Sequence, residues 1–261
     1  MAGNEIEVCR FLFSNIENID LKHIGQVREI GAPLLNEHGY LPVQTLDDLL
    51  KISTEDARKK ADVYLNGVGV SIKQLGGSFA YNRLQRANII EVYSILGFSS
   101  PESKLNQIDE EVYKFHQGLL TSRNRPWEDL FSEQDFKDLL NFLMMRGSPN
   151  LGMSNHPAAF ILEAPATDLS CSNIQVYSFS EYFDIHKQKL KIAIRRQWVG
   201  QDSNSEHSRA LSLTKKISNA PWVFNDIAGQ PKLSARGRRW REDFPEAEKK
   251  TVYFLMIEKL K

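Results

Sequence analysis

The clearest pattern of apolar and polar positions lies between Asp62 and Lys73, where the sequence is Asp-Val-Tyr-Leu-Asn-Gly-Val-Gly-Val-Ser-Ile-Lys. Asn66-Gly67 separates two runs in which apolar residues alternate with other residues, and this dipeptide is a strong short-range signal for a β-hairpin. A type I′ turn requires a positive φ at both central residues, and Asn and Gly tolerate that best. The pattern therefore predicts two short antiparallel strands joined by a two-residue turn.

The predicted register divides the hairpin side chains between the two faces of a sheet, because successive side chains of a strand point to opposite faces. One face is purely apolar and consists of Val63, Leu65, Val68, Val70 and Ile72. The other face consists of Asp62, Tyr64, Gly69, Ser71 and Lys73. A four-residue loop would keep these two sets, whereas a loop of odd length would mix them. A carboxylate and an amine are thus expected diagonally across two strands, behind a buried face.

Asp62, a hairpin and then Ser71-Ile72-Lys73 resemble the core of the PD-(D/E)xK nuclease superfamily, to which most type II restriction endonucleases belong. In that family the Asp opens the second strand of a mixed sheet, and an acidic-x-Lys tripeptide lies on the third. The resemblance covers roughly residues 50–97. It implies hydrolysis of phosphodiester bonds in double-stranded DNA, with Mg²⁺ as the cofactor.

The resemblance also implies a role for each residue of the set. The carboxylate of Asp62 and the backbone carbonyl of Ile72 would bind Mg²⁺, a cation that prefers oxygen ligands. The ion would polarise the phosphate and lower the pKa of a bound water. Lys73 would position or deprotonate that water and stabilise the developing negative charge. The alternative from spacing alone is a surface hairpin whose exposed face carries a salt-bridged Asp and Lys.

Two residues depart from the family pattern. Ala61 stands where the family often has Pro, and Ser71 stands where the second acidic residue usually lies. Some restriction enzymes with a Ser-x-Lys tripeptide recover the lost carboxylate from the following helix. Ser71 is therefore kept in the candidate catalytic set, and a second carboxylate has to be found elsewhere.

The helix predicted after the hairpin, over Phe79–Phe98, offers one candidate. Glu91 is the only acidic residue between Lys73 and Glu102, and we favour it as the relocated catalytic and metal-binding carboxylate. It lies outside the apolar stripe of that helix and could instead face solvent. Glu29 is the second candidate, because an acidic residue from the N-terminal part commonly lies near the metal in this superfamily.

The formal net charge of zero hides an uneven distribution. Residues 1–186 hold 16 Lys and Arg against 25 Asp and Glu, whereas residues 187–243 hold 13 against 5. Basic residues gathered in one part are compatible with DNA binding, because arginine suits phosphate and the O6/N7 edge of guanine. The candidate DNA-binding residues are Arg195, Arg196, Lys215, Lys216, Arg236, Arg238, Arg239 and Arg241. The alternative is a solvated basic face.

The whole pattern predicts an α/β protein with a mixed central β-sheet flanked by helices, as in a restriction-endonuclease-like core. An amphipathic helix is expected over Glu5–Ile19, a helical insertion over 101–146 and strands over 158–162, 174–179, 190–196 and 251–257. We divide the chain into a catalytic part, residues 1–150, and a β-rich basic DNA-recognition part, residues 151–261. The two parts could also pack as a single domain.

Composition indicates a cytoplasmic protein without membrane association, and the resemblance to restriction endonucleases implies a prokaryotic one. No stretch approaches the roughly 20 apolar residues needed to span a bilayer, and the N-terminus lacks the basic start and apolar run of a signal peptide. Cys9 and Cys171 have no metal-ligand spacing, and both are expected to be buried small hydrophobes in a reducing compartment.

Because palindromic DNA targets mirror a two-fold axis, we expect a homodimer, with a monomer as the alternative.

The leading function is therefore a Mg²⁺-dependent, site-specific DNA endonuclease of type II. A nonspecific, repair or junction nuclease of the same fold is the alternative with the same chemistry. The alternative from another class is a catalytically silent nucleic-acid-binding protein that uses the basic C-terminal part as its working surface. The recognition sequence is not encoded in these motifs, because it depends on base-edge contacts and DNA deformation.

Overall fold

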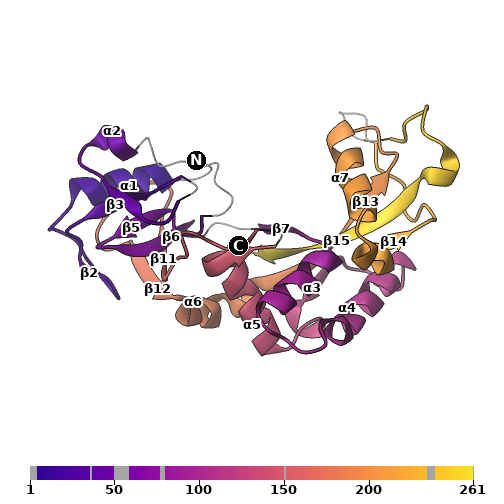
Figure 1. Ribbon diagram of the computed structural model, residues 1–261, viewed down its shortest axis with the longest axis horizontal. Helices are drawn as coiled ribbons and strands as arrows, with labels where there is room; N and C mark the ends of the chain where they lie inside the picture. The colour runs from indigo at the N-terminus through magenta and orange to yellow at the C-terminus, as the bar shows by residue number, and fades with distance from the viewer. Residues whose placement is uncertain are drawn as a thin grey trace. The chain divides into compact units, whose positions relative to one another are not determined.

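The chain is described here from a computed structural model, which covers residues 5–35, 37–49, 59–76, 80–149, 151–233 and 239–260. It divides into two compact units, each built from two separate stretches of sequence (Figure 1). The first unit consists mainly of Met1–Ser78 and Asp135–Lys189, and the second of Phe79–Gln134 and Leu190–Leu260. The continuous division at residue 150 that the sequence suggested stays a prediction.

The first unit is organised around a six-stranded mixed sheet with the strand order β12-β11-β6-β5-β3-β4. Its strands are β3 (Ile30–Pro33), β4 (Tyr40–Pro42), β5 (Val63–Leu65), β6 (Val68–Gln74), β11 (Phe160–Ala164) and β12 (Gln175–Ser178). The pair β6–β11 is parallel, and the other neighbours are antiparallel. The predicted α/β class with a mixed central sheet is confirmed, and the β3–β5–β6 meander is consistent with a restriction-endonuclease-like core.

The predicted hairpin is present in the predicted register. Val63 pairs with Val70 and Leu65 with Val68, so the two-residue turn is confirmed. Its central residues both have positive φ, 50° at Asn66 and 79° at Gly67. The Asn66 side chain also accepts the backbone N–H of Arg28 at 2.8 Å, which ties the turn to the segment that leads into β3.

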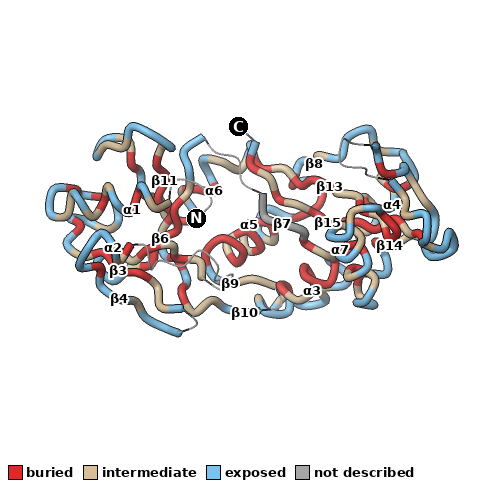
Figure 2. Tube along the Cα trace, turned by 90° about the horizontal axis from the view of Figure 1, so that it is seen from above, coloured by how far each residue is buried: buried red, intermediate tan, exposed pale blue. Residues whose placement is uncertain are grey.

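The apolar face of the hairpin forms part of the core of the first unit. Helix α1 (Glu5–Ser14) packs its buried Val8 and Leu12 into the same cluster as Val63, Val70 and Ile72. Figure 2 shows the buried character of β6 and β11 along the trace. The helix ends five residues earlier than predicted, because Glu17 takes a positive φ of 68° and the chain turns into β1 (Asp20–Leu21) and β2 (Gly25–Gln26).

Close contact between β6 and the segment before β11 explains the glycine in the middle of the hairpin. A Cβ at Gly69 would lie 2.5 Å from the carbonyl oxygen of Pro157. The carbonyl of Gly69 accepts the N–H of Ala159 at 2.8 Å, so the approach is hydrogen-bonded. A side chain at this position would push β11 away from β6, the strand that carries Lys73.

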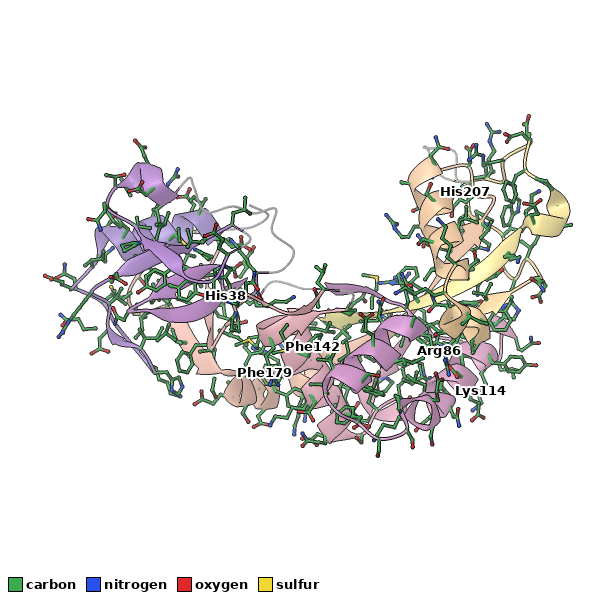
Figure 3. All side chains as sticks on the ribbon, viewed as in Figure 1. His38, Arg86, Lys114, Phe142, Phe179 and His207 are labelled. Atoms are coloured by element: carbon green, nitrogen blue, oxygen red, sulfur yellow. The ribbon has the colours of Figure 1, made fainter. Side chains whose placement is uncertain are left out.

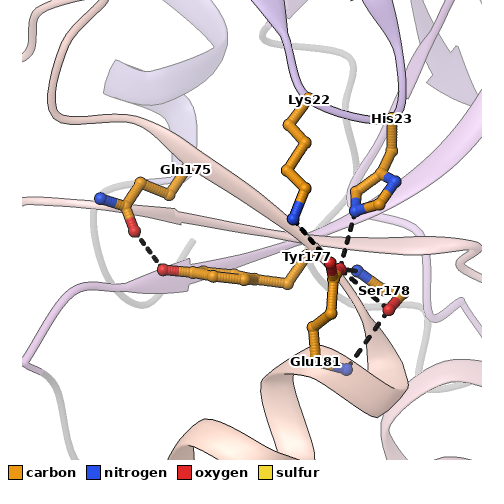
Figure 4. Close-up of polar contacts among 6 residues, drawn as sticks. All are labelled: Lys22, His23, Gln175, Tyr177, Ser178 and Glu181. Atoms are coloured by element: carbon orange, nitrogen blue, oxygen red, sulfur yellow. Dashed lines mark hydrogen bonds and ion pairs between the residues drawn. The ribbon is translucent and has the colours of Figure 1, made fainter.

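The helices of the first unit include α2 (Leu46–Leu49), α5 (Glu133–Asn141), a π-helical turn at Phe142–Arg146 and α6 (Phe179–His186). A capping box opens α6: Ser178 Oγ accepts the N–H of Glu181 at 3.3 Å, and the Glu181 carboxylate accepts the N–H of Ser178 at 2.8 Å. Figure 4 shows that Lys22 and His23 reach the same carboxylate, at 2.6 and 2.7 Å. Glu181 therefore fastens the β1–β2 turn to α6.

The second unit contains a sheet built on one long antiparallel pair, β13 (Leu190–Val199) with β15 (Lys250–Lys259). The other strands are β7 (Ala80–Leu84), β8 (Asn124–Pro126) and β14 (Val223–Phe224). The strands expected over 190–196 and 251–257 are confirmed. The helix expected over Phe79–Phe98 is wrong at its start, because residues 80–84 pair with β15 as a strand and helix α3 spans only Arg86–Ile95.

The helical insertion packs with the C-terminal sheet in this second unit. Arg86 at the start of α3, labelled in Figure 3, is buried and donates to Asp109 and Glu102 of α4 (Pro101–His116), both at 2.8 Å. Its third donor group reaches the carbonyl of Ser218 at 3.1 Å, in the 3₁₀ turn Ile217–Trp222. Helix α7 (Asn204–Thr214) packs on β13 and β15 through Ala210 and Leu213.

The two cysteines differ in their surroundings. Cys9 is buried in α1, and this burial, followed by the charge of Asp62, raises the pKa of its thiol to about 12. Cys171 is exposed in the connection between β11 and β12, so the expectation that it is buried is wrong.

No helix in the described part of the chain is long and apolar enough to cross a membrane.

The Glu181 cluster predicts a specific dependence of stability on pH. The hydrogen bond from Lys22 and those from Ser178 hold the pKa of Glu181 well below its ordinary value, so its contribution is present above the ordinary glutamate pKa of about 4.3 and is lost as the pH falls through the folded-state pKa. In urea unfolding, wild type should be more stable than Glu181→Gln at pH 7, and the gap should shrink below about pH 4.

Lys22→Met provides the partner control, since it removes the first of these contacts. The loss of stability caused by Glu181→Gln at pH 7 should be smaller when Lys22→Met is already present. A gap between wild type and Glu181→Gln that stays constant from pH 7 to pH 3 would contradict this account.

Candidate active site

The structure brings Asp62, Ser71 and Lys73 together in the first unit. The Asp62 Oδ2 atom accepts the N–H of Ile72 at 2.7 Å and the hydroxyl of Ser71 at 3.3 Å. The Lys73 ammonium donates to Ser71 Oγ at 2.7 Å and to the Ile72 carbonyl at 3.0 Å. Lys73 Nζ lies 4.0 Å from Asp62 Oδ2, so one polar network joins the predicted set.

The hairpin register produces this arrangement. The backbone N–H of Asp62 donates to the carbonyl of Val70 at 2.8 Å, which extends the β5–β6 ladder by one position and places Asp62 opposite Ser71. Lys73 follows two residues later on the same face of β6. Asp62 therefore immediately precedes the second strand of the β3–β5–β6 meander, and the Ser-x-Lys tripeptide lies on the third strand, as the resemblance implies.

The polar face of the hairpin is largely covered, which argues against a simple surface ion pair. Ser71 is 2% exposed, and the side chains of Lys73 and Asp62 are 22% and 19% exposed. Exposed ion pairs contribute little to stability, whereas covered charges need partners to offset desolvation. Here the partners are a backbone N–H, a hydroxyl and a backbone carbonyl, all within the hairpin.

The oxygen atoms around the Lys73 ammonium are of the kind that a hard divalent cation requires. They comprise the Asp62 carboxylate, the Ile72 carbonyl and the Ser71 hydroxyl. Mg²⁺ is commonly held by one or two carboxylates, with waters and phosphate oxygens completing the coordination. This donor set fits Mg²⁺ with Asp62 as its carboxylate and Ile72 as its carbonyl ligand.

Glu5, at the first residue of α1, is a carboxylate electrostatically coupled to this site that the sequence analysis did not identify. Burial, followed by the negative charge of Asp62, raises the pKa of Glu5, while Lys73 and Lys59 act in the opposite direction. The carboxyl is therefore electrostatically coupled to both candidate catalytic residues. One sequence signal could have identified it: Glu5 precedes Val8, Cys9 and Leu12 by three, four and seven residues, on the apolar stripe of its helix.

Lysines add positive charge beside the carboxylates. Burial, followed by repulsion from the Lys73 ammonium, lowers the pKa of Lys60 to about 8, and the charge of Asp62 acts in the opposite direction. Lys59 influences both Glu5 and the Cys9 thiol. Such a group of cations would attract an anionic substrate. Neither lysine stands out in the sequence, because both precede the hairpin pattern that begins at Asp62.

The other two carboxylate candidates lie elsewhere. Glu29 is beside the hairpin turn, where its carbonyl accepts the N–H of Asn66 at 3.0 Å and its carboxylate accepts the hydroxyl of Tyr40 at 2.7 Å. That end of the hairpin is four strand positions, or about 13 Å, from Asp62, so the structure does not bring Glu29 into the network. Glu91 is half-buried on α3 in the second unit, and its assignment stays a prediction.

Within the described ranges, no group of three or more His, Cys, Asp and Glu side chains converges in a way that could hold a metal ion. The oxygen donors at the hairpin are of the kind that suits Mg²⁺ rather than zinc, which prefers nitrogen and sulfur ligands.

The candidate DNA-binding residues are all in the second unit. Arg195 and Arg196 are on β13, and Lys215 and Lys216 are exposed at the end of α7. Arg239 lies 4.0 Å from Asp202, and Arg241 lies 3.6 Å from Asp243, so acidic neighbours partly balance both charges. Arg236 and Arg238 lie outside the described residues.

Comparisons with known proteins add little to this geometry. No protein-family model and no curated protein matches the chain. Among solved structures, the restriction endonuclease MspI in complex with its cognate DNA is similar with a TM-score of 0.30 and 12% sequence identity, over 97% of this chain and 77% of that chain. A TM-score at that level does not support a conclusion about fold or function.

Proposed function

We propose that the chain is a Mg²⁺-dependent DNA endonuclease that hydrolyses phosphodiester bonds in double-stranded DNA in the manner of a type II restriction enzyme. The observation that supports this proposal most strongly is the network of Asp62, Ser71 and Lys73 on one covered face of the β5–β6 hairpin. It unites a carboxylate, a backbone carbonyl and an amine, which are the groups that the chemistry requires.

Each residue of the network has a defined part in the proposed reaction. Asp62 would hold the cation through its carboxylate, while its hydrogen bond to the N–H of Ile72 fixes the peptide whose carbonyl is the second ligand. Lys73 would hydrogen-bond the attacking water and stabilise the negative charge that develops on the phosphate. The Ser71 hydroxyl, which accepts from Lys73 and donates to Asp62, would keep the two side chains in register.

Bound Mg²⁺ would supply Lewis-acid polarisation of the phosphate and a lowered pKa of coordinated water. Glu5 would add a second negative charge to this site, as its coupling to Asp62 suggests. The basic residues of the second unit would bind the DNA backbone or base edges, and palindromic targets would favour a homodimer.

A catalytically silent nucleic-acid-binding protein is the alternative function, because Ser71 replaces a carboxylate and the Asp62–Lys73 pair could be structural. Incubation of plasmid DNA with Mg²⁺ or with EDTA separates the two functions. Discrete bands that need Mg²⁺ are the expected result. Smearing would favour a nonspecific nuclease, and a mobility shift without cutting would favour the silent binder.

Lys73→Ala tests the role of the amine. We expect the cleavage rate to fall by about 10²–10⁴-fold while DNA affinity stays within an order of magnitude, because Lys73 acts on the chemical step. Single-turnover cleavage and a binding titration measure the two quantities. Lys22→Ala, which removes another acid-paired lysine of the first unit, is the control and should cleave normally. Full activity of Lys73→Ala would exclude this active site.

Glu5→Gln, Glu29→Gln and Glu91→Gln identify the carboxylate that compensates for Ser71. Because Glu5 is coupled to Asp62, Glu5→Gln should raise the Mg²⁺ concentration for half-maximal cleavage by about tenfold. Glu29→Gln should behave as wild type, since Glu29 lies at the turn end of the hairpin. An unchanged Mg²⁺ requirement in Glu5→Gln together with an inactive Glu91→Gln would place the missing carboxylate on α3.

Combined replacement of Arg236, Arg238, Arg239 and Arg241 by Gln tests the basic segment. Each phosphate contact that is lost should reduce the slope of log affinity against log salt by about 0.9. Arg10→Gln, which removes one positive charge from α1 of the first unit, is the control and should leave the slope unchanged. Equal slopes for wild type and the quadruple variant would show that the segment does not contact phosphates.

A further inference from the structure

The second unit contains a pocket of about 600 Å³ that has no part in the site at the hairpin. It lies along β13 from Ile194 to Trp198, beside α7 and the loop of residues 229–232. Its volume falls within the range of pockets that bind small molecules. Buried Ile194 and Phe254, together with Phe115, give it apolar walls.

Several residues that line this pocket carry buried polar atoms without hydrogen-bond partners. Gln197 is 6% exposed and Gln201 is 2% exposed, and the amide oxygen of each has no partner. The indole N–H of Trp198 and the Nε atoms of Arg195 and Arg196 also have none. Buried polar groups are nearly always hydrogen-bonded, so these unpartnered atoms need an explanation.

A bound ligand would supply the missing hydrogen-bond partners. The mixture of unpartnered donors and acceptors restricts the chemical class of that ligand. The two amide oxygens need donors, whereas the indole and guanidinium groups need acceptors. The terminal torsion of a glutamine is soft, so each amide can rotate to meet a ligand in the pocket. A phosphate or carboxylate alone offers only acceptors. A nucleobase offers both kinds of group on its edges, and amide side chains are common partners of adenine.

The pocket also contains a fixed planar cation. The Arg196 guanidinium lies 5.3 Å from the centre of the Phe115 ring, and its Nη1 donates to the carbonyl of Ala228 at 3.2 Å. At Gly229 a Cβ would lie 1.7 Å from the same Nη1, so a side chain at this position would displace the guanidinium. Guanidinium planes and aromatic rings are surfaces on which unpaired bases stack.

The charge of the lining adds a preference for an anion. Among the described residues, Arg123, Arg195, Arg196, Arg209 and Lys232 line the pocket against a single acidic residue, Glu206. Glu258 pairs with Arg195, and Glu206 accepts from Gln201. The remaining basic side chains fit a phosphate attached to the base.

We propose that this pocket binds a single unpaired nucleotide of DNA, with the base against the apolar wall of Ile194 and Phe254, beside the Arg196 guanidinium, and the phosphate among the basic side chains. The choice of DNA as the source rests on the proposed function. A base inside a duplex is stacked, so it reaches a pocket only when it is turned out of the helix or already unpaired. A free nucleotide offers the same base and phosphate groups. The experiment therefore has to distinguish binding of a free nucleotide from binding of a nucleotide within DNA.

Binding of full-length protein to three probes in EDTA tests the proposal without requiring cleavage. The probes are a duplex with one bulged 2-aminopurine, the same sequence fully paired, and 2-aminopurine deoxyribonucleoside monophosphate. Wild type should bind the bulged duplex at least tenfold more tightly than the paired duplex. Gln197→Leu should lose this preference while its melting temperature stays equal or rises, because an unpartnered buried amide is removed.

Two further variants keep the result interpretable. Trp198→Phe removes only the indole N–H and should reduce the preference severalfold even if Gln197→Leu folds poorly. Gln107→Leu, on α4 outside the pocket, is the matched control and should retain the full preference. An unchanged preference in both pocket variants would overturn the proposal, as would equal binding of bulged and paired duplexes by wild type.

If wild type bound the free monophosphate tightly but bound the bulged and paired duplexes equally, DNA would be excluded as the source of the nucleotide. The result for this pocket is independent of the result for the proposed nuclease function. A protein that cuts plasmid but shows no pocket-dependent preference keeps the nuclease function and loses this inference. A protein that shows the preference but never cuts keeps the pocket and loses the nuclease function.

Discussion

The two-residue turn at Asn66-Gly67 is the constraint on which the candidate active site depends. Both residues adopt positive φ, and this fixes the register in which Val63 faces Val70. That register sends the apolar side chains into the core with α1 and leaves Asp62, Ser71 and Lys73 on the opposite face. A slip by one residue would exchange the two faces and bury the charges against α1, so core packing and the polar network specify the same register.

The hairpin could be predicted from sequence because its determinants are local: turn chemistry and alternation act within twelve residues. Residues 80–84 show the limit of such reasoning. They lead directly into an apolar helical stripe, yet they form β7, because β15, about 170 residues later in the chain, provides a strand to pair with. The division into two discontinuous units has the same origin, since it depends on which distant segments pack together.

The site itself was only partly predictable. Asp62 and Lys73 followed from register, and their placement with Ser71 in one network agrees with that reasoning. Glu5 belongs to the same electrostatic cluster but comes from a helix 57 residues earlier, and spacing within the hairpin contains no information about it. The pocket in the second unit could not be predicted from sequence either. Gln197 and Gln201 are distinguished from other glutamines only by their buried, unpartnered amide oxygens.

The central claim is that the oxygen atoms around the Lys73 ammonium form a binding site for a divalent cation. The most direct measurement is an anomalous difference map from crystals of the protein grown with Mn²⁺ as a substitute for Mg²⁺. The account predicts a peak bonded to the Asp62 carboxylate and the Ile72 carbonyl, with Lys73 moved off that carbonyl to make room. A Lys73 ammonium that stays on the Ile72 carbonyl, with no Mn²⁺ beside Asp62, would contradict it.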